Sequence, residues 1–187
     1  SYVWNYYQSV YFPLVPQHIT EPGAEYQRIW YVHRPGQTIS AIESQLAQTH
    51  LREFFFGDPG LTFRLYEAPP DAEGVPFENG MRFHGAQVLD EHGQARVQPL
   101  VYREGETIRL RLWWSVDAPL TTDYSITLQL LNEQGLLVQA DGAPQPISLN
   151  TTQAVPSAQT SAWQTDEFYL DERTMILPYP TGQADYT

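Results

Sequence analysis

Short runs of alternating apolar and polar residues fill the second half of the chain, and this period of two limits its fold more than any other feature. The runs are MRFHGAQVLD at 81–90, RVQPLVYREGETIRLRLWWSV at 96–116, DYSITLQLLNEQGLLVQADG at 123–142 and DEFYLDERTMILPYP at 166–180. Turn signals such as Arg-Glu-Gly-Glu, Glu-Gln-Gly and Asp-Gly interrupt or separate them. Alternation places side chains on the two faces of a strand, and many short strands joined by such turns are typical of an antiparallel sandwich. The sequence therefore predicts an Ig-like or jelly-roll-like β-sandwich over residues 80–187.

The first 68 residues show a different order of patterns. YQRIWYVHRPG at 26–36 predicts a strand that ends in a Pro-Gly turn, and LREFFFGDPGLTFRLYEAPP at 51–70 predicts two strands around Gly-Asp-Pro-Gly. Between them, SAIESQLAQTHL at 40–51 predicts the one good helix, because Ser40 and Glu43 form a capping box ahead of an apolar face. We therefore expect a small α/β layer over residues 1–68, and a mainly-β α+β fold for the whole chain.

Proline, glycine and acidic residues dominate residues 69–79, which predicts a linker between the two parts. At the other end, Gly182–Thr187 resembles the beginning of a strand that stops short. The sandwich is therefore expected to lack its last strand.

The charge of the chain narrows the classes of partner. It carries 10 basic and 22 acidic residues for a formal net charge of −12, and all of the basic residues are Arg. Such a balance argues against nucleic acid and against anionic membrane surfaces as partners. No apolar run reaches the roughly 18 residues of a membrane helix, so we expect no direct membrane insertion by this part. Cysteine is absent, which excludes disulfides, a thiolate nucleophile and Cys-based metal centres.

Two adjacent tryptophans in RLRLWWSV, residues 109–116, raise the question of a sugar-stacking platform. Alternation places Trp114 on the apolar face with Leu112, and Trp113 on the other face beside Arg109 and Arg111. Trp114 is therefore expected in the core. Trp113, with the two arginines, is a candidate ligand-binding group, and packing against another layer of the same chain is the alternative. Trp163, in a Ser/Thr-rich loop, is a second candidate, with folding back onto the sandwich as its alternative.

Carboxylates near the last strand suggest two further alternatives. Asp166, Glu167 and Asp171 are candidate ligands of a structural calcium ion, the only cofactor considered, although their spacing does not match an EF-hand and a solvated acidic surface is the alternative. A glycan hydrolase would need two such groups facing each other about 5 to 10 Å apart. The five histidines have no paired spacing, and neither Gly-x-Ser-x-Gly nor a phosphate-binding Gly-x-x-x-x-Gly-Lys occurs.

Several of these patterns occur together in one known family. They are a Gly-Glu-Thr entry to a Trp-bearing strand at 105–107, an Asp-Tyr opening at 123–124, an Asp-Gly-Ala-Pro turn at 141–144, a Trp before a strand ending in Leu-Pro, and a Gly-x-x-x-Tyr-Thr end. The chain thereby resembles the carboxyl-terminal β-sandwich module of large bacterial membrane glycosyltransferases related to the dolichyl-phosphate-mannose protein mannosyltransferases. RIWYVHRPG and LTFRLYEAP resemble the last strands of the extracytoplasmic α/β region before that module.

The resemblance implies a place and a role. The family's catalytic residues lie in its membrane-embedded part, which no segment here matches, so no catalytic residue is carried over. It implies a non-catalytic accessory domain on the extracytoplasmic face of the membrane, which positions glycan or acceptor or braces the catalytic part. Its partners would be the rest of the parent protein and a glycan. A carbohydrate-binding module that uses exposed Trp, and a glycan hydrolase that uses the acidic residues, remain the alternatives.

Overall fold

The computed structural model describes residues 26, 28–33, 43–46, 62–90, 93, 95–96, 102–133, 135–147 and 156–179, together with the backbone of 51–57. The described strands are β1 (Arg28–His33), β2 (Leu51–Gly57), β3 (Thr62–Glu67), β4 (Val75–Pro76), β5 (Met81–Leu89), β6 (Thr107–Val116), β7 (Ile126–Asn132), β8 (Gly135–Gly142) and β9 (Tyr169–Ile176). A 3-10 turn covers Thr160–Ala162, and residues 43–46 are helical. The predicted α+β fold, mainly β and antiparallel, is confirmed.

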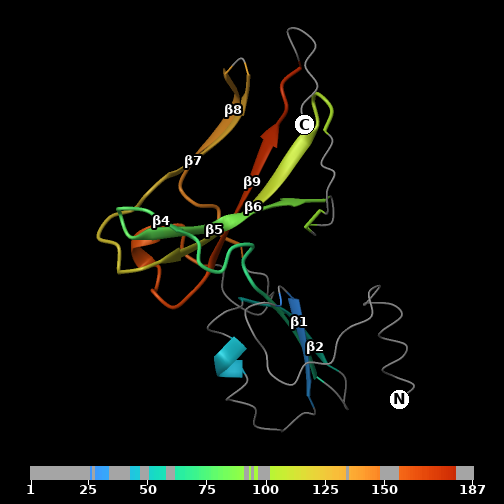
Figure 1. Ribbon diagram of the computed structural model, residues 1–187, viewed down its shortest axis with the longest axis vertical. Helices are drawn as coiled ribbons and strands as arrows, with labels where there is room; N and C mark the ends of the chain where they lie inside the picture. Colours follow the sequence, from blue (N-terminus) through green and yellow to red (C-terminus); the bar gives the residue numbers. More distant parts are fainter. Residues whose placement is uncertain are drawn as a thin grey trace, which may run out of the picture.

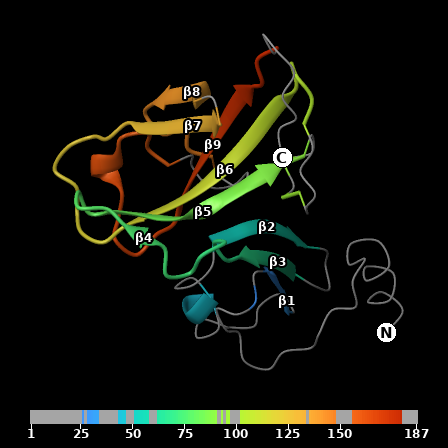
Figure 2. The ribbon, with the colours of Figure 1, turned by 45° about the horizontal axis from the view of Figure 1, so that its top comes forward.

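These strands form three antiparallel sheets. One has the order β1-β3-β2, the second β4-β5-β6-β9, and the third is the β7–β8 hairpin. The four-stranded sheet lies between the hairpin on one side and the three-stranded sheet on the other (Figures 1 and 2). Strand β6 is central in this arrangement because it pairs with β5 along one edge and with β9 along the other. An Ig-like or jelly-roll-like sandwich stays a prediction.

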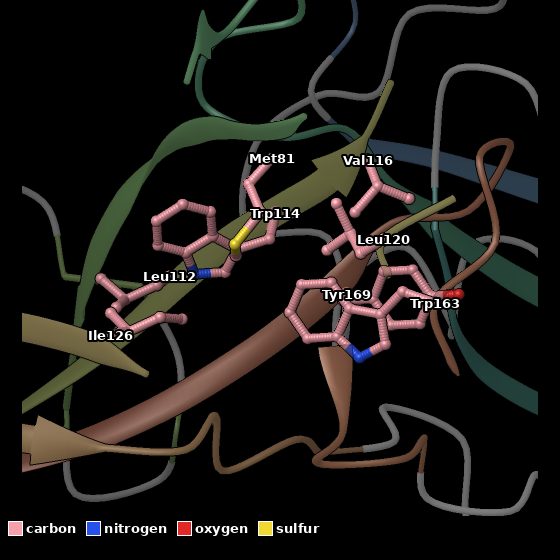
Figure 3. Packing of buried hydrophobic residues seen from close by; sticks show 8 residues of the cluster. All are labelled: Met81, Leu112, Trp114, Val116, Leu120, Ile126, Trp163 and Tyr169. Atoms are coloured by element: carbon pink, nitrogen blue, oxygen red, sulfur yellow. The ribbon is translucent and has the colours of Figure 1, made fainter. Parts of the chain in front are cut away.

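The main core lies on the hairpin side of the four-stranded sheet. Alternation along β6 directs Leu112, Trp114 and Val116 into it, as their positions in the sequence predicted. Figure 3 shows these side chains with their partners from β5, β7, β9 and the loops between strands, namely Met81, Leu120, Ile126, Trp163 and Tyr169. Each Å² of apolar surface removed from water stabilises the folded state by about 25 cal/mol. This cluster is therefore the main source of stability for the second part of the chain.

A smaller cluster holds the first part together. Ile29 of β1, Leu46 of the helical residues and Tyr66 of β3 are buried against one another. Residues 43–46 of the helix predicted at 40–51 are helical, and Leu46 packs against the sheet, whereas Leu51 belongs to β2. Ser40, the predicted helix cap, and the segment Gly182–Thr187 lie outside the described residues.

The segment predicted as a linker, residues 69–79, is fastened to β5. The amide of Asp71 donates to the carbonyl of His84 at 2.9 Å, and β4 adds a short antiparallel strand beside β5. Arg82 of β5 donates to the carbonyl of Glu73 at 2.8 Å and pairs with both carboxylate oxygens of Asp117 at 2.8 and 2.9 Å. The domain boundaries themselves stay a prediction, but this segment contributes to the sheet and is not a free spacer.

A glycine permits this close approach. Gly85 has φ +105°, and a Cβ built there would lie 3.0 Å from Cβ of Pro70. Both the backbone conformation and the contact with the preceding segment therefore disfavour any larger residue.

We expect Gly85→Ala to lower the free energy of unfolding by about 2–4 kcal/mol, since it adds a steric overlap to the cost of a positive φ. Gly135→Ala is the matched control, because Gly135 has φ +123° and nothing within 4 Å of the added Cβ. The control should lose about 1–2 kcal/mol. Urea unfolding measures both, and equal losses would contradict the proposed contact between residue 70 and β5.

Candidate functional site

Trp113, the candidate for a sugar platform, is completely buried. Its side chain is 0% exposed, on the face of β6 opposite the main core. The indole Nε1 donates to Oε1 of Gln87 on the neighbouring strand at 2.9 Å, and the ring lies edge-on to Phe168 at 6.1 Å between centroids. A sugar ring needs an open aromatic face. Trp113 therefore packs against other parts of the same chain and does not present a stacking face for a sugar.

Arg111 lies beside Trp113 on the same face and is also buried. Its Nη2 and Nε donate to Oε1 of Glu172 on β9 at 2.9 and 3.1 Å, and Nη2 also donates to the carbonyl of Gly93 at 3.3 Å. On its other side, Nη1 lies 4.0 Å from Oε2 of Glu67 on β3. One guanidinium thus joins both sheets through two carboxylates.

Glu67 contacts two arginines, Arg28 and Arg111. It is 6% exposed, and its Oε1 accepts hydrogen bonds from the guanidinium of Arg28 on β1. Burying charges is costly unless they are paired and hydrogen-bonded, and this arrangement supplies partners for each of them. We refer to Arg28, Glu67, Arg111 and Glu172 as the charged seam.

Arg109, the other arginine named as a candidate, lies at the margin of the seam. Its Nη2 is 3.4 Å from Oε2 of Glu172, and Nη1 donates to the carbonyl of Asp90 at 3.5 Å. Its side chain is 38% exposed, compared with 6% for Arg111. The structure therefore brings Arg109, Arg111 and Trp113 together on one face of β6, but as parts of an interior contact.

His84 belongs to the same face and has both ring nitrogens occupied. Nδ1 donates to the carbonyl of Asp71 at 2.8 Å, so Nε2 accepts from the hydroxyl of Ser115, also at 2.8 Å. The ring meets Phe168 edge-on at 5.0 Å. A histidine near a serine is the beginning of a nucleophilic site, but here His84 is buried beside the half-buried Ser115 and fastens the segment before β4 to the sheet.

Trp163, the loop candidate, also packs inside. It is 2% exposed, stacks on Tyr169 at 4.3 Å and 4° between ring planes, and donates from Nε1 to the carbonyl of Ser157 at 2.9 Å. The adjacent 3-10 turn is fixed by Asp123, whose Oδ1 accepts from the amide and the hydroxyl of Ser161 at 3.0 and 2.8 Å. These bonds lower the pKa of Asp123. The loop therefore closes one end of the main core.

The three carboxylates considered for calcium do not converge. Asp171 is 0% exposed, and both of its carboxylate oxygens accept a hydrogen bond from Nε of Arg173. Its Oδ1 also accepts from the amide of Gln145 at 2.7 Å. Asp166 and Glu167 lie at the surface before β9. Across the part of the chain that the structure describes, no group of three or more potential ligands is positioned to hold a metal ion.

Arg173 explains why a carboxylate is buried at position 171. Its Nη2 donates to the carbonyls of Gly142 and Ala143 at 3.1 and 2.8 Å, directly after the hairpin. The same segment continues as a partner of β9, where the amide of Ile147 donates to the carbonyl of Leu170 at 3.2 Å. The Asp171–Arg173 pair thus attaches the end of β8 to β9.

Tyr169 carries the clearest electrostatic perturbation of this region. Burial, with an added contribution from Glu167, raises its pKa from 10.0 to about 12. The phenol hydroxyl donates to Oε2 of Glu167 at 3.0 Å and accepts from the amide of Gln164 at 2.6 Å. Burial and the hydrogen bond to Glu167 favour the neutral phenol, while the bond from the Gln164 amide opposes them.

The candidate side chains Arg111, Trp113 and Trp163 thus bond within the interior of the described part of the chain. The buried carboxylates Glu67 and Asp171 each accept hydrogen bonds from an arginine. No protein-family model, curated protein or solved structure matches this chain. None of the described helical residues form a segment long and apolar enough to cross a membrane.

Sequence reasoning identified two arginines of this face but missed their partners. Glu67 and Glu172 were not recognised as these partners. A strand position shows which side of its own sheet a residue faces and not which other sheet will cover it. One signal was available: the segment 170–175 carries charged residues on both faces, Glu172 on one and Asp171 and Arg173 on the other.

Replacing the two adjacent tryptophans separates their roles. We expect Trp113→Phe to lower the free energy of unfolding by about 2–3 kcal/mol, since it removes volume and leaves Oε1 of Gln87 without its donor. In Trp114, the buried Nε1 has no hydrogen-bond partner among the described residues, so Trp114→Phe should cost about 1 kcal/mol less. Urea unfolding of both variants is the measurement. A larger loss for Trp114→Phe would contradict the assignment.

Alkaline titration tests the environment of Tyr169. Because folding raises its pKa from 10.0 to about 12, the folded state favours the neutral phenol, and the resulting stability is complete below pH 10. It is lost as the pH rises through 12. Unfolding free energies at pH 8 to 12 should therefore fall more steeply for the wild type than for Tyr169→Phe. Tyr179→Phe, at a side chain 78% exposed, is the control and should follow the wild type. Identical slopes for the wild type and Tyr169→Phe would refute the effect.

Proposed function

We propose that this chain is a non-catalytic accessory domain of a membrane glycosyltransferase, on the extracytoplasmic face of the membrane, where it braces the catalytic part through protein contacts. The family and the location in this proposal rest on the sequence resemblance. The choice of bracing over glycan binding rests on one observation: Trp113, Trp163 and Arg111 are buried and bonded within the chain.

The enzymatic alternative has less support. A glycan hydrolase needs an open cleft with two opposed carboxylates, and one of them must be available as an acid. In the described residues, the buried carboxylates Glu67 and Asp171 are each neutralised by arginine. Among the described residues, large apolar side chains are exposed and available for contact with another protein, namely Val75, Phe77, Leu131, Leu136, Ile176 and Tyr179.

A fluorescence titration with a glycan panel tests this choice. The chain should show no saturable change in Trp emission with any glycan, because the candidate indoles have no open face, and no release of reducing sugar. Trp163→Phe is the assigning variant. A saturable response in the wild type that disappears in this variant would establish a carbohydrate-binding module, and sugar release would establish a hydrolase.

The coding sequence of the parent protein tests the location. A run of membrane-spanning helices before this domain is the expected result. A parent that carries a secretion signal and no membrane-spanning helix would overturn the proposal.

A further inference from the structure

The β7–β8 hairpin has two faces of opposite design. On the inward face, Ile126 and Leu128 pack into the main core. The outward face is read from the cross-strand pairs, which are Thr127 with Asp141, Gln129 with Gln139, and Leu131 with Leu136. All six of these side chains are exposed. The outward face is thus polar where the hairpin joins the sheet and apolar at its tip.

Two leucines at a hairpin tip are costly to leave in water. Leu131 is 61% exposed and Leu136 is 52% exposed, and they lie directly opposite each other on the two strands. Polar side chains at both positions would preserve the alternation of the ribbon equally well. The hairpin forms its own layer on the far side of the four-stranded sheet from the three-stranded sheet (Figure 2). The exposed side chains of Leu131 and Leu136 can therefore contact another polypeptide.

The charge of the hairpin indicates which charged side chains the other polypeptide carries at the contact. Between residues 126 and 142 the only charged residues are Glu133, in the turn, and Asp141, and both are acidic. The whole chain carries a net charge of −12 and contains no Lys. A partner bordered by basic side chains would gain from this field at the edge of the contact.

The net charge of the chain and the small apolar area of the tip disfavour two other partners, a second copy of the chain and a membrane. A second copy would bring another −12 to the interface, and two leucines supply far less than the roughly 800 Å² per partner of a stable dimer. A membrane would have to accept Glu133 at the point of insertion, without a Lys or Arg in the hairpin to meet anionic lipid headgroups.

We infer that the tip of the β7–β8 hairpin, formed by Leu131, Glu133 and Leu136, docks onto an apolar strip of another polypeptide that is flanked by Lys or Arg side chains. The inference rests on the proposed function insofar as it makes protein contact the role of the domain. The leucines bury their side chains in the strip, while Glu133 meets its basic border.

Binding of a designed peptide to the full chain tests the inference. The probe is a fluorescently labelled amphipathic helical peptide made of Leu and Lys, and the comparison peptides replace Lys with Glu or Leu with Ser. We expect saturable binding of the Leu/Lys peptide alone by fluorescence anisotropy. Equal binding of the Ser/Lys peptide would overturn the role of the leucines, and no binding of the Leu/Lys peptide would overturn the inference.

Variants locate the contact. Leu131→Thr combined with Leu136→Thr keeps β-forming residues at the tip and should weaken Leu/Lys peptide binding at least about tenfold, with an unchanged unfolding midpoint. Glu133→Gln should weaken it less, and most clearly at low salt. Ile176→Thr is the matched control, because it removes an aliphatic side chain that is 64% exposed outside the hairpin, and it should bind as the wild type does. Equal binding by the double variant would overturn the inference.

Two further measurements distinguish the other occupants. Sedimentation with anionic and zwitterionic vesicles should leave the wild type in solution, and ultracentrifugation should show one copy per particle. Vesicle binding, or a dimer that the double variant dissociates, would replace the inferred partner with a membrane or a second copy. A glycan response would refute the proposed function without altering the peptide result, so the two failures are distinguishable.

Discussion

The guanidinium of Arg111 is the point on which the arrangement of this protein depends. It lies on β6, the central strand of the largest sheet, and its charge is shared between Glu172 on β9 and Glu67 on β3. Because Glu67 also receives Arg28 from β1, the charged seam joins strands from both parts of the chain. Removing one of its two buried members, Glu67 or Arg111, leaves the other charge without compensation, which typically costs about 3–5 kcal/mol. The seam therefore makes the relation between the two sheets specific, whatever its net contribution to stability.

The same strands carry a second buried ion pair on their opposite face. There Asp171 and Arg173 fasten the segment after β8 to β9, so the hairpin is held over the main core. Arginine suits both places, because its planar group can donate to several acceptors at once and stays charged when buried. Two polar side chains that the sequence offered as site residues, Arg111 and Asp171, thus take part in connections between layers. This use of the interior supports a bracing role and leaves the outer surfaces, the hairpin tip above all, for contact with partners.

The sequence predicted the strands well and the contacts between sheets poorly. Strands β1, β3, β5 and β6 lie within the predicted segments because alternation and turn residues are local properties, and the same alternation placed Trp114 in the core and Trp113 opposite. Contacts between sheets depend on residues far apart along the chain, such as Arg111 and Glu67, and no local pattern encodes that pairing. The segment 69–79 shows the same limit, since its prolines and acids indicated a spacer while its backbone bonds to β5.

A double-mutant cycle across Glu67 and Arg111 measures whether Arg111 joins the two sheets. Glu67→Ala, Arg111→Ala and the double variant would be unfolded in urea beside the wild type, with Trp fluorescence and backbone circular dichroism as two probes. The account predicts a coupling of at least about 1 kcal/mol and one transition that both probes report together. Effects that add to within about 0.3 kcal/mol, or separate transitions for the two probes, would show that the sheets fold independently and that Arg111 does not join them.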